Sequence, residues 1–254
     1  MIELKNLSSG YGKQPVLQNV SARFAEGKLT AVIGPNGCGK STLFKTMIRL
    51  LPIASGDILI NGKSLKQMNQ AQTARALAYL SQNVNHTHLT VGELVLHGRF
   101  AHTRFPRIYT ARDRAAAEEA MARMGISDLA PCALSSLSGG MRQSAYIAMA
   151  LSQGSDHILL DEPTAHLDIA HRISLLKNLR TLAKQGKCVV AVLHDLPLAM
   201  AYADELAVMQ NGKLLMQDTP ENVFSSHVID RVFGAPLCRF AQNEGYIYYF
   251  NNTP

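Results

Sequence analysis

A glycine-rich run that ends in a lysine and two hydroxyl residues carries the clearest chemistry of this sequence. It comprises Gly34, Pro35, Asn36, Gly37, Cys38, Gly39, Lys40, Ser41 and Thr42. Glycines let successive backbone N–H groups point into one concavity, where they bind phosphate oxygens. We expect Lys40 to reach the β- and γ-phosphates of a nucleoside triphosphate, Ser41 to ligate Mg²⁺ and Thr42 to lie nearer the α-phosphate.

The segments on either side have the periodicity that such a loop requires. Residues 29–33 are a continuous apolar run, which predicts a buried strand, and residues 43–48 predict an amphipathic helix. The N-terminus of that helix adds a positive dipole end next to the loop. A glycine turn that binds nothing is the alternative, and the strand and helix in these positions argue against it.

Two adjacent acids follow a second apolar run. Residues 157–160 predict a strand that ends in Asp161 and Glu162. Asp161 is placed to hold Mg²⁺, and Glu162 is placed to accept the proton of an attacking water. A solvated turn is the alternative for two such carboxylates.

Two more polar residues follow predicted strands. Gln82 follows residues 77–81, and His194 follows residues 187–193. Ligands of open α/β sheets bind outside the carboxyl ends of strands, so Gln82 is placed to reach the metal and the triphosphate. His194 reaches the γ-phosphate only if the strand order brings it beside the acid pair. His166 and His171 lack such a placement, and we expect both at the surface.

A second phosphate-binding tip is predicted where a helix begins at Ser138, Gly139 and Gly140. Ser138 is a natural N-cap, and the free N–H groups behind it point outward at a positive dipole end. A well-capped helix with no ligand is the alternative. Tyr11, in a predicted loop between two strands, is either a surface aromatic or a platform for a nucleotide base.

Composition excludes several classes of protein. The chain has 254 residues with 47% hydrophobic and 17% charged residues, which is typical of a globular protein. Its net charge of +6 is spread along the sequence, so we expect no nucleic-acid partner. The four cysteines lie far apart, which predicts reduced thiols. No window approaches about 18 apolar residues, so any role at a membrane requires a partner.

The chain is predicted to be one domain with an insertion. Residues 1–82 and 154–254 carry the strand patterns, whereas residues 83–153 carry helical patterns and a basic, aromatic loop at 102–109. We expect that loop to dock a partner, because loops on a rigid scaffold often carry binding. Residues 238–250 suggest a terminal strand without a motif.

Taken together, these motifs resemble those of the ATP-binding subunit of an ATP-binding-cassette (ABC) transporter over essentially the whole chain. They follow the family's order: aromatic-loop Tyr11, Walker A Gly34–Thr42, Q-loop Gln82, signature Leu137-Ser138-Gly139-Gly140, Walker B Ile158–Glu162, D-loop Ala165–Asp168 and switch His194. The sequence departs from the family's motifs at two places. Met141 replaces a common glutamine, and Ala165-His166 replaces a common pair of small residues. Both departures are small, because neither removes a catalytic group. Met141 could alter coupling to the partner cassette.

The resemblance implies an α/β fold of the P-loop NTPase class. This fold has a RecA-like mixed sheet core, an antiparallel β subdomain and an inserted α-helical subdomain. It also implies a homodimer in which the signature residues Ser138, Gly139 and Gly140 contact the ATP held by the other cassette, next to Asp168. Glu162 would be the general base, His194 would orient the γ-phosphate and Gln82 would couple Mg²⁺ to the membrane subunit.

Within the family, the sequence is most similar to ATPases of metal-chelate importers, the iron–siderophore, haem and vitamin B12 group. The stretches that indicate this are residues 90–99, 168–171 and 193–202. Such a protein hydrolyses ATP on the cytoplasmic face of the membrane, with a permease docked on the helical subdomain and a substrate-binding protein outside. The cargo never touches this subunit, so zinc or manganese import stays an alternative.

Other classes of ABC ATPase fit less well. DNA-repair members carry a long coiled coil between Walker A and the signature, and residues 43–136 contain no heptad repeat. Ribosome-associated members usually fuse two cassettes, whereas this sequence carries one set of motifs.

Overall fold

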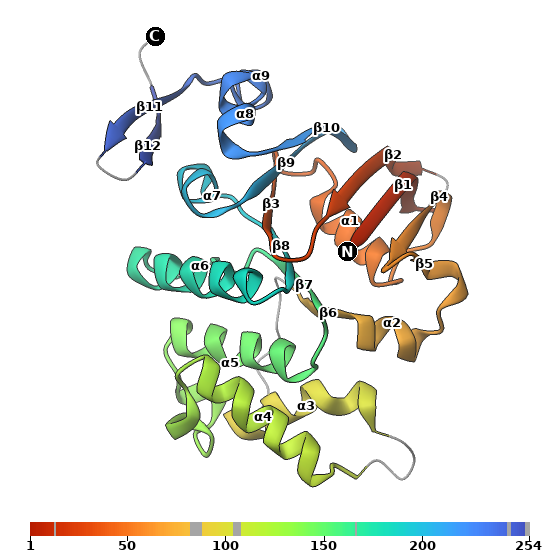
Figure 1. The fold of residues 1–254 in the computed structure, drawn as a ribbon, viewed down its shortest axis with the longest axis vertical. Helices are drawn as coiled ribbons and strands as arrows, with labels where there is room; N and C mark the ends of the chain where they lie inside the picture. Colours follow the sequence, from red (N-terminus) through yellow and green to blue (C-terminus); the bar gives the residue numbers. More distant parts are fainter. Residues whose placement is uncertain (13, 82–87, 104–107, 166, 243–244, 252–254) are drawn as a thin grey trace.

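The computed structural model describes residues 1–12, 14–81, 88–103, 108–165, 167–242 and 245–251. Its central sheet has six strands in the order β10–β9–β3–β8–β7–β6 (Figure 1). These strands are β3 (Leu29–Ile33), β6 (Leu77–Leu80), β7 (His157–Asp161), β8 (Cys188–Val192), β9 (Glu205–Gln210) and β10 (Lys213–Asp218). Only the pairing of β10 with β9 is antiparallel, so the predicted mixed sheet is confirmed.

A second, antiparallel sheet lies beside the first. Its order is β2–β1–β4–β5, formed by β1 (Ile2–Tyr11), β2 (Gln14–Phe24), β4 (Ile53–Ile60) and β5 (Lys63–Ser64). Helix α1 (Lys40–Met47) packs between the two sheets, where Phe44 and Met47 are fully buried among apolar residues of both. This packing fixes the position of the loop that precedes α1.

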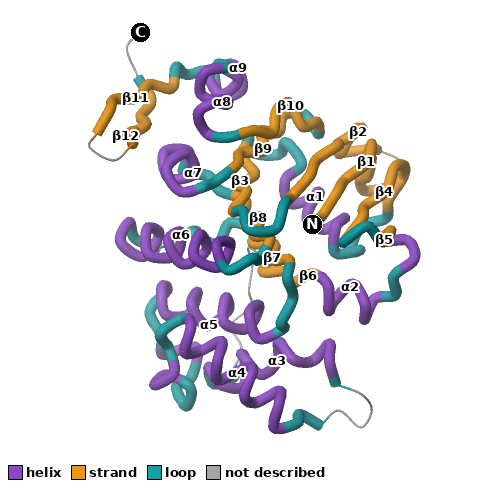
Figure 2. Tube along the Cα trace, viewed as in Figure 1, coloured by secondary structure: helices purple, strands orange, loops and turns teal. Residues whose placement is uncertain are grey.

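A group of helices between β6 and β7 forms one end of the molecule (Figure 2). It comprises α3 (Val91–His97), α4 (Ala111–Arg123) and α5 (Gly139–Ser152), which pack against one another. Reciprocal capping boxes start two of them: Thr90 with Glu93 for α3, and Thr110 with Asp113 for α4. Each box satisfies backbone N–H groups that have no partner within the helix, which explains why the helices begin where they do.

The remaining helices cover the sheet and lead to the C-terminus. They are α2 (Gln70–Ala76), α6 (Ile169–Lys184), α7 (Leu196–Tyr202), α8 (Pro220–Ser225) and α9 (Val228–Phe233), followed by the hairpin β11 (Leu237–Gln242) and β12 (Gly245–Phe250). Among the described residues, no helix is both long enough and apolar enough to cross a bilayer.

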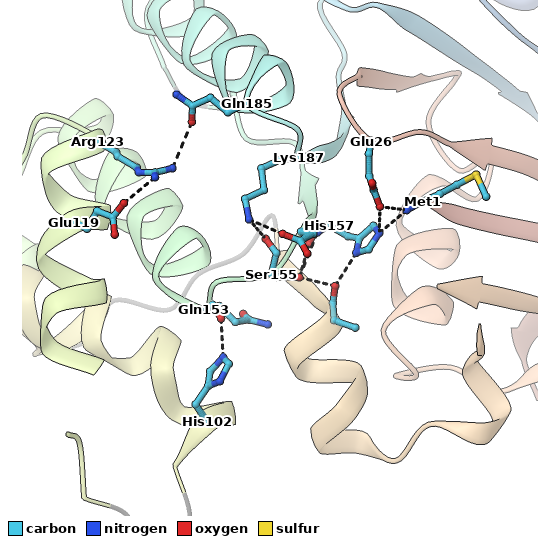
Figure 3. A network of polar contacts seen from close by, with 12 residues as sticks. Met1, Glu26, His102, Glu119, Arg123, Gln153, Ser155, His157, Gln185 and Lys187 are labelled. Atoms are coloured by element: carbon cyan, nitrogen blue, oxygen red, sulfur yellow. Dashed lines mark hydrogen bonds and ion pairs between the residues drawn. The ribbon is translucent and has the colours of Figure 1, made fainter. Parts of the chain in front are cut away.

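Polar contacts join the helical group to the rest of the chain, and Figure 3 shows the one between Arg123 and Gln185. The Gln153 side-chain amide donates to the Leu77 carbonyl at 2.9 Å, and the backbone carbonyl oxygen of Gln153 lies 2.8 Å from Nε2 of His102. Arg123 of α4 donates to Gln185 at the end of α6 at 3.4 Å. These contacts connect the end of α5 to the start of β6, and α4 to α6.

Some predicted element bounds are wrong. Tyr11 lies in β1 and pairs with Gln14, because the hairpin turn between β1 and β2 is shorter than expected. The terminal strand is a hairpin, and α7 and α9 were not foreseen. Two Asn-Gly turns join neighbouring strands, β4 to β5 and β9 to β10: Asn61 and Asn211 both have positive φ and are followed by glycines with positive φ.

Candidate nucleotide-binding site

The glycine-rich loop connects β3 to α1, as predicted. A Cβ atom at Gly34 would lie 2.2 Å from the Met209 carbonyl oxygen, so only glycine allows the loop to pass that strand. Gly39 has a φ of 107° and precedes the first turn of α1. The Lys40 ammonium donates to the carbonyl oxygens of Gly34 at 2.7 Å and Pro35 at 3.0 Å. The cation is thus held inside the curve of the loop, where phosphate oxygens would accept from it.

The two predicted metal ligands from opposite parts of the chain meet beside this loop. Ser41 Oγ donates to Asp161 Oδ1 at 3.3 Å. Asp161 is 3% exposed, and burial raises the pKa of its carboxyl, with the neighbouring Glu162 adding to the effect. A hydroxyl and a carboxylate are oxygen ligands of the kind that Mg²⁺ prefers, and the cation would offset the cost of the buried charge. Gln82, the third expected ligand, lies outside the described residues.

Tyr79 is a neighbour of the metal ligands that the sequence analysis missed. Its hydroxyl lies 3.5 Å from Asp161 Oδ2, and burial raises the pKa of the phenol. Its ring packs edge-on against Phe44 of α1. No local pattern marks Tyr79, because its proximity to Asp161 arises only from the pairing of β6 with β7.

Glu162 and His194 lie in contact at the carboxyl ends of neighbouring strands. Strands β7 and β8 are parallel, with Asp161 opposite Val192, so the condition set for His194 is met. Nε2 of His194 lies 2.5 Å from Oε1 of Glu162. Glu162 has a φ of 54°, a left-handed conformation that is costly for a residue with a Cβ.

Tyr11 lies at the end of β1, beside α1. Its side chain is 53% exposed, and Lys45 of α1 lies with its ammonium 6.0 Å from the ring centroid and 3.5 Å from the hydroxyl. The ring therefore stands at the edge of the helix that carries the phosphate loop. It has an open face on which a base could stack.

The second predicted phosphate-binding segment, Ser138–Gly140, lies at the surface, away from the phosphate loop. Ser138 accepts a hydrogen bond from the Met141 N–H at 3.3 Å and so caps α5 as expected. Ser138 and Gly139 are exposed, and Gly140 is half-buried. Figure 1 shows α5 in the helical group, apart from α1 and its loop. Within one chain, Ser138–Gly140 and the phosphate loop thus lie on different parts of the molecule.

Asp168 caps α6 and contacts a histidine three residues on. Its carboxylate accepts from the His171 N–H at 2.9 Å and lies 2.7 Å from Nδ1 of His171. The hydrogen bond from the His171 N–H lowers the pKa of Asp168. The His171 side chain is 51% exposed, so its predicted surface position is confirmed. His166 lies outside the described residues.

Known proteins are similar to this chain in sequence and in fold. Residues 17–165 match the family model described as ABC transporter. The ferric enterobactin transport ATP-binding protein FepC of Escherichia coli K12 is 40% identical over 91% of this chain and 86% of its own length. A solved metal-chelate type ABC transporter in an inward-facing conformation superposes with a TM-score of 0.84 at 26% identity, covering 98% of this chain and 96% of that chain. A dimeric bacterial ABC transporter cassette gives a TM-score of 0.74 at 25% identity, covering 87% and 99%.

Proposed function

This chain belongs to the ABC transporter family, and from that premise we propose that it is the ATP-hydrolysing subunit of a bacterial importer for an iron–siderophore complex or a similar metal chelate. It binds and hydrolyses ATP, as ATP-binding proteins of this family do. The cargo class is supported by the ferric enterobactin relative and by the metal-chelate type transporter that superposes on the chain.

One observation carries the ATPase chemistry. Strands β3, β8 and β7 are adjacent and parallel, so their carboxyl ends form one edge of the sheet. The phosphate loop follows β3, the Ser41–Asp161 pair joins α1 to the end of β7, and His194 and Glu162 meet across β8 and β7. Phosphate binding, metal ligation and proton transfer are thus available at one place.

In the proposed reaction, Glu162 accepts a proton from water while the water oxygen attacks the γ-phosphorus. The bond from that phosphorus to the bridging oxygen breaks, and ADP and phosphate leave. His194 holds the Glu162 carboxylate and the γ-phosphate in line, and Lys40 offsets the charge of the phosphate oxygens. Mg²⁺, held by Ser41 and Asp161, would supply further neutralisation of phosphate charge.

The proposed working unit is a pair of these chains. Ser138, Gly139 and Gly140 of one chain would complete the site that the phosphate loop of the other begins, with Asp168 beside it. The exposed positions of Ser138 and Gly139, on a helix apart from the loop of their own chain, support this assignment. The dimeric cassette that superposes on the chain supports it as well.

Transport requires a membrane partner. We place the chain on the cytoplasmic face of the membrane, bound through its helical group to a polytopic permease, with a substrate-binding protein on the other side. The loop at 102–109 is the segment that we expect to dock a partner. Its residues 104–107 lie outside the described residues.

Capture of the tagged chain from its native membrane, with identification of the co-purified proteins, tests this proposal. We expect a polytopic permease, and the reconstituted complex should take up radiolabelled iron–siderophore in an ATP-dependent manner. The same complex with E162Q should bind the permease without uptake. A ribosomal or DNA-bound partner would contradict the transport function, and uptake of zinc or manganese in place of iron chelate would contradict the cargo.

A further inference from the structure

His171 touches two segments that are far apart in the sequence. On one side, Nδ1 of its ring lies 2.7 Å from Oδ2 of Asp168, while its backbone N–H donates to Oδ1 of the same carboxylate at 2.9 Å. The ring cannot turn freely without losing the first of these contacts. The contacts with Asp168 thus fix the orientation of the His171 ring and of the Asp168 carboxylate.

On the other side, the ring lies against the first turn of α5. A Cβ atom built on Gly140 would lie 2.3 Å from Cδ2 and 2.8 Å from Nε2 of His171. The ring therefore occupies the space that a side chain at position 140 would need. Gly140 and His171 also line a cavity of about 40 Å³ between α5 and α6. The close approach is possible because residue 140 is glycine.

We propose that His171 is a positioning residue that fixes the signature residues Ser138–Gly140 relative to Asp168. The His171 ring connects the two segments, because Asp168 holds its orientation and Gly140 packs against it. Helix α5 belongs to the helical group and α6 covers the central sheet, so His171 spans the junction between them (Figure 1). This inference rests on the proposed function, in which both segments face the ATP-bound partner chain.

A histidine that only supports Asp168 as the N-cap of α6 would keep the same hydrogen bonds to that carboxylate and contribute to helix stability alone. The two roles differ in what they affect. A cap contributes to the folding of α6, whereas a link between two partner-facing segments contributes to pairing of the chains. Binding of ATP to the phosphate loop of a single chain should be independent of His171 in either case.

Two substitutions separate the contacts of the ring. H171N keeps a side-chain N–H near the position of Nδ1 but removes the part of the ring that touches Gly140, whereas H171F keeps a ring and removes the donor to Asp168. In an E162Q background, we expect each to weaken ATP-driven pairing about tenfold, with the ATP affinity of the single chain unchanged. Pairing is measured by sedimentation velocity, and affinity with a fluorescent ATP analogue.

A matched control is available in His227, whose Nδ1 lies 2.8 Å from Asp230, also three residues on, at the start of α9. H227N should pair like the E162Q parent. Thermal unfolding shows that each variant is folded. If either His171 variant pairs as tightly as the parent, or loses single-chain ATP affinity to the same extent as pairing, the positioning role is wrong.

A double-mutant cycle tests the Gly140 contact directly. G140A should impair pairing strongly when His171 is present, because the new methyl group meets the ring, and much less in the H171A chain. Equal and additive effects would overturn the proposal. Failure of E162Q itself to pair with ATP would instead contradict the proposed function. Normal pairing of E162Q with no effect at His171 or Gly140 would contradict only this inference.

Discussion

Two short contacts between residues from distant parts of the sequence define the chemistry at the scale of single residues. Ser41 donates to Asp161, and His194 contacts Glu162. The first places two oxygen ligands where a cation would offset the buried Asp161 charge. The second fixes the carboxylate that we assign as the base. Phosphoryl transfer depends mainly on positioning and charge neutralisation, which is what these contacts provide.

The role of Glu162 as proton acceptor predicts a large loss in E162Q. Glutamine has the same shape but takes up no proton, so we expect ATP turnover to fall about 10²–10⁴-fold while ATP binding is retained. Phosphate release and fluorescent-ATP titration measure the two quantities. E221Q, at an exposed residue that pairs with Arg239, is the control and should keep full turnover. Turnover of E162Q at the unsubstituted rate would refute the assignment.

The open face of Tyr11 predicts an effect on binding rather than on chemistry. Stacking of a base on an aromatic ring contributes about 1–3 kcal/mol, so Y11A should weaken ATP affinity roughly tenfold with kcat at saturating ATP unchanged. Y11F retains the ring and should bind ATP like the unsubstituted chain. Equal affinity of Y11A and Y11F would show that Tyr11 is only a surface aromatic.

At the scale of elements, a buried ion pair ties the helical group together. Arg99, in the turn of 3₁₀ helix after α3, donates to Asp113 of α4 at 2.9 Å and to the Ser152 carbonyl at the end of α5 at 2.9 Å. Hydrogen bonds from Thr110, with those from Arg99, lower the pKa of Asp113 to about 2. The end of α3, the start of α4 and the end of α5, the helix that carries the signature residues, are thus connected through one guanidinium group.

Loss of the Asp113 charge should destabilise this group. D113N leaves the Arg99 guanidinium buried without a counter-ion, so we expect the free energy of unfolding to fall by about 3 kcal/mol in urea titration. D128N, at an exposed position nearby, should change it by less than about 0.5 kcal/mol. Equal stability of the two variants would contradict the role of the pair.

The same pKa predicts a pH dependence. The folded-state pKa of Asp113 lies below its ordinary value of 3.8, so its contribution to stability is present above about pH 4 and is lost as pH falls towards 2. It amounts to roughly 2 kcal/mol. The D113N chain should lack this component of acid destabilisation, and an unchanged acid profile would show that Asp113 does not supply it.

Local patterns in the sequence predicted the phosphate loop, the acid pair and the cap at Ser138, because each is a short run with its own periodicity and turn chemistry. They did not predict contacts that depend on strand order or helix packing. His194 contacts Glu162 only because β8 lies beside β7. Tyr79 lies close to Asp161 only because β6 is the neighbour of β7 on the other side. The contact of His171 with Gly140 joins two helices, and no local sequence pattern in either helix predicts it.

At the scale of the whole molecule, the proposed function gives each chain half of one ATP site, the phosphate loop, and half of a second ATP site, the signature residues. The phosphate loop lies between the sheets, and the signature residues lie on the helical group, apart from it (Figure 1). In the head-to-tail pair that we propose, each half would meet its complement on the other chain. ATP would then act as the link between chains, and hydrolysis would release it. Movement of the helical group during this cycle is what we expect the permease to receive.

The molar mass of the E162Q chain in the presence of ATP and Mg²⁺, measured by light scattering, tests this central claim most directly. We expect the mass to double on addition of ATP, and to stay that of a single chain for E162Q/S138F, which still binds ATP but presents a bulky ring in place of Ser138. E162Q/T219A, which removes a comparable helix cap from α8, should pair like E162Q. Equal pairing of the S138F chain, or no pairing of E162Q with ATP, would contradict it.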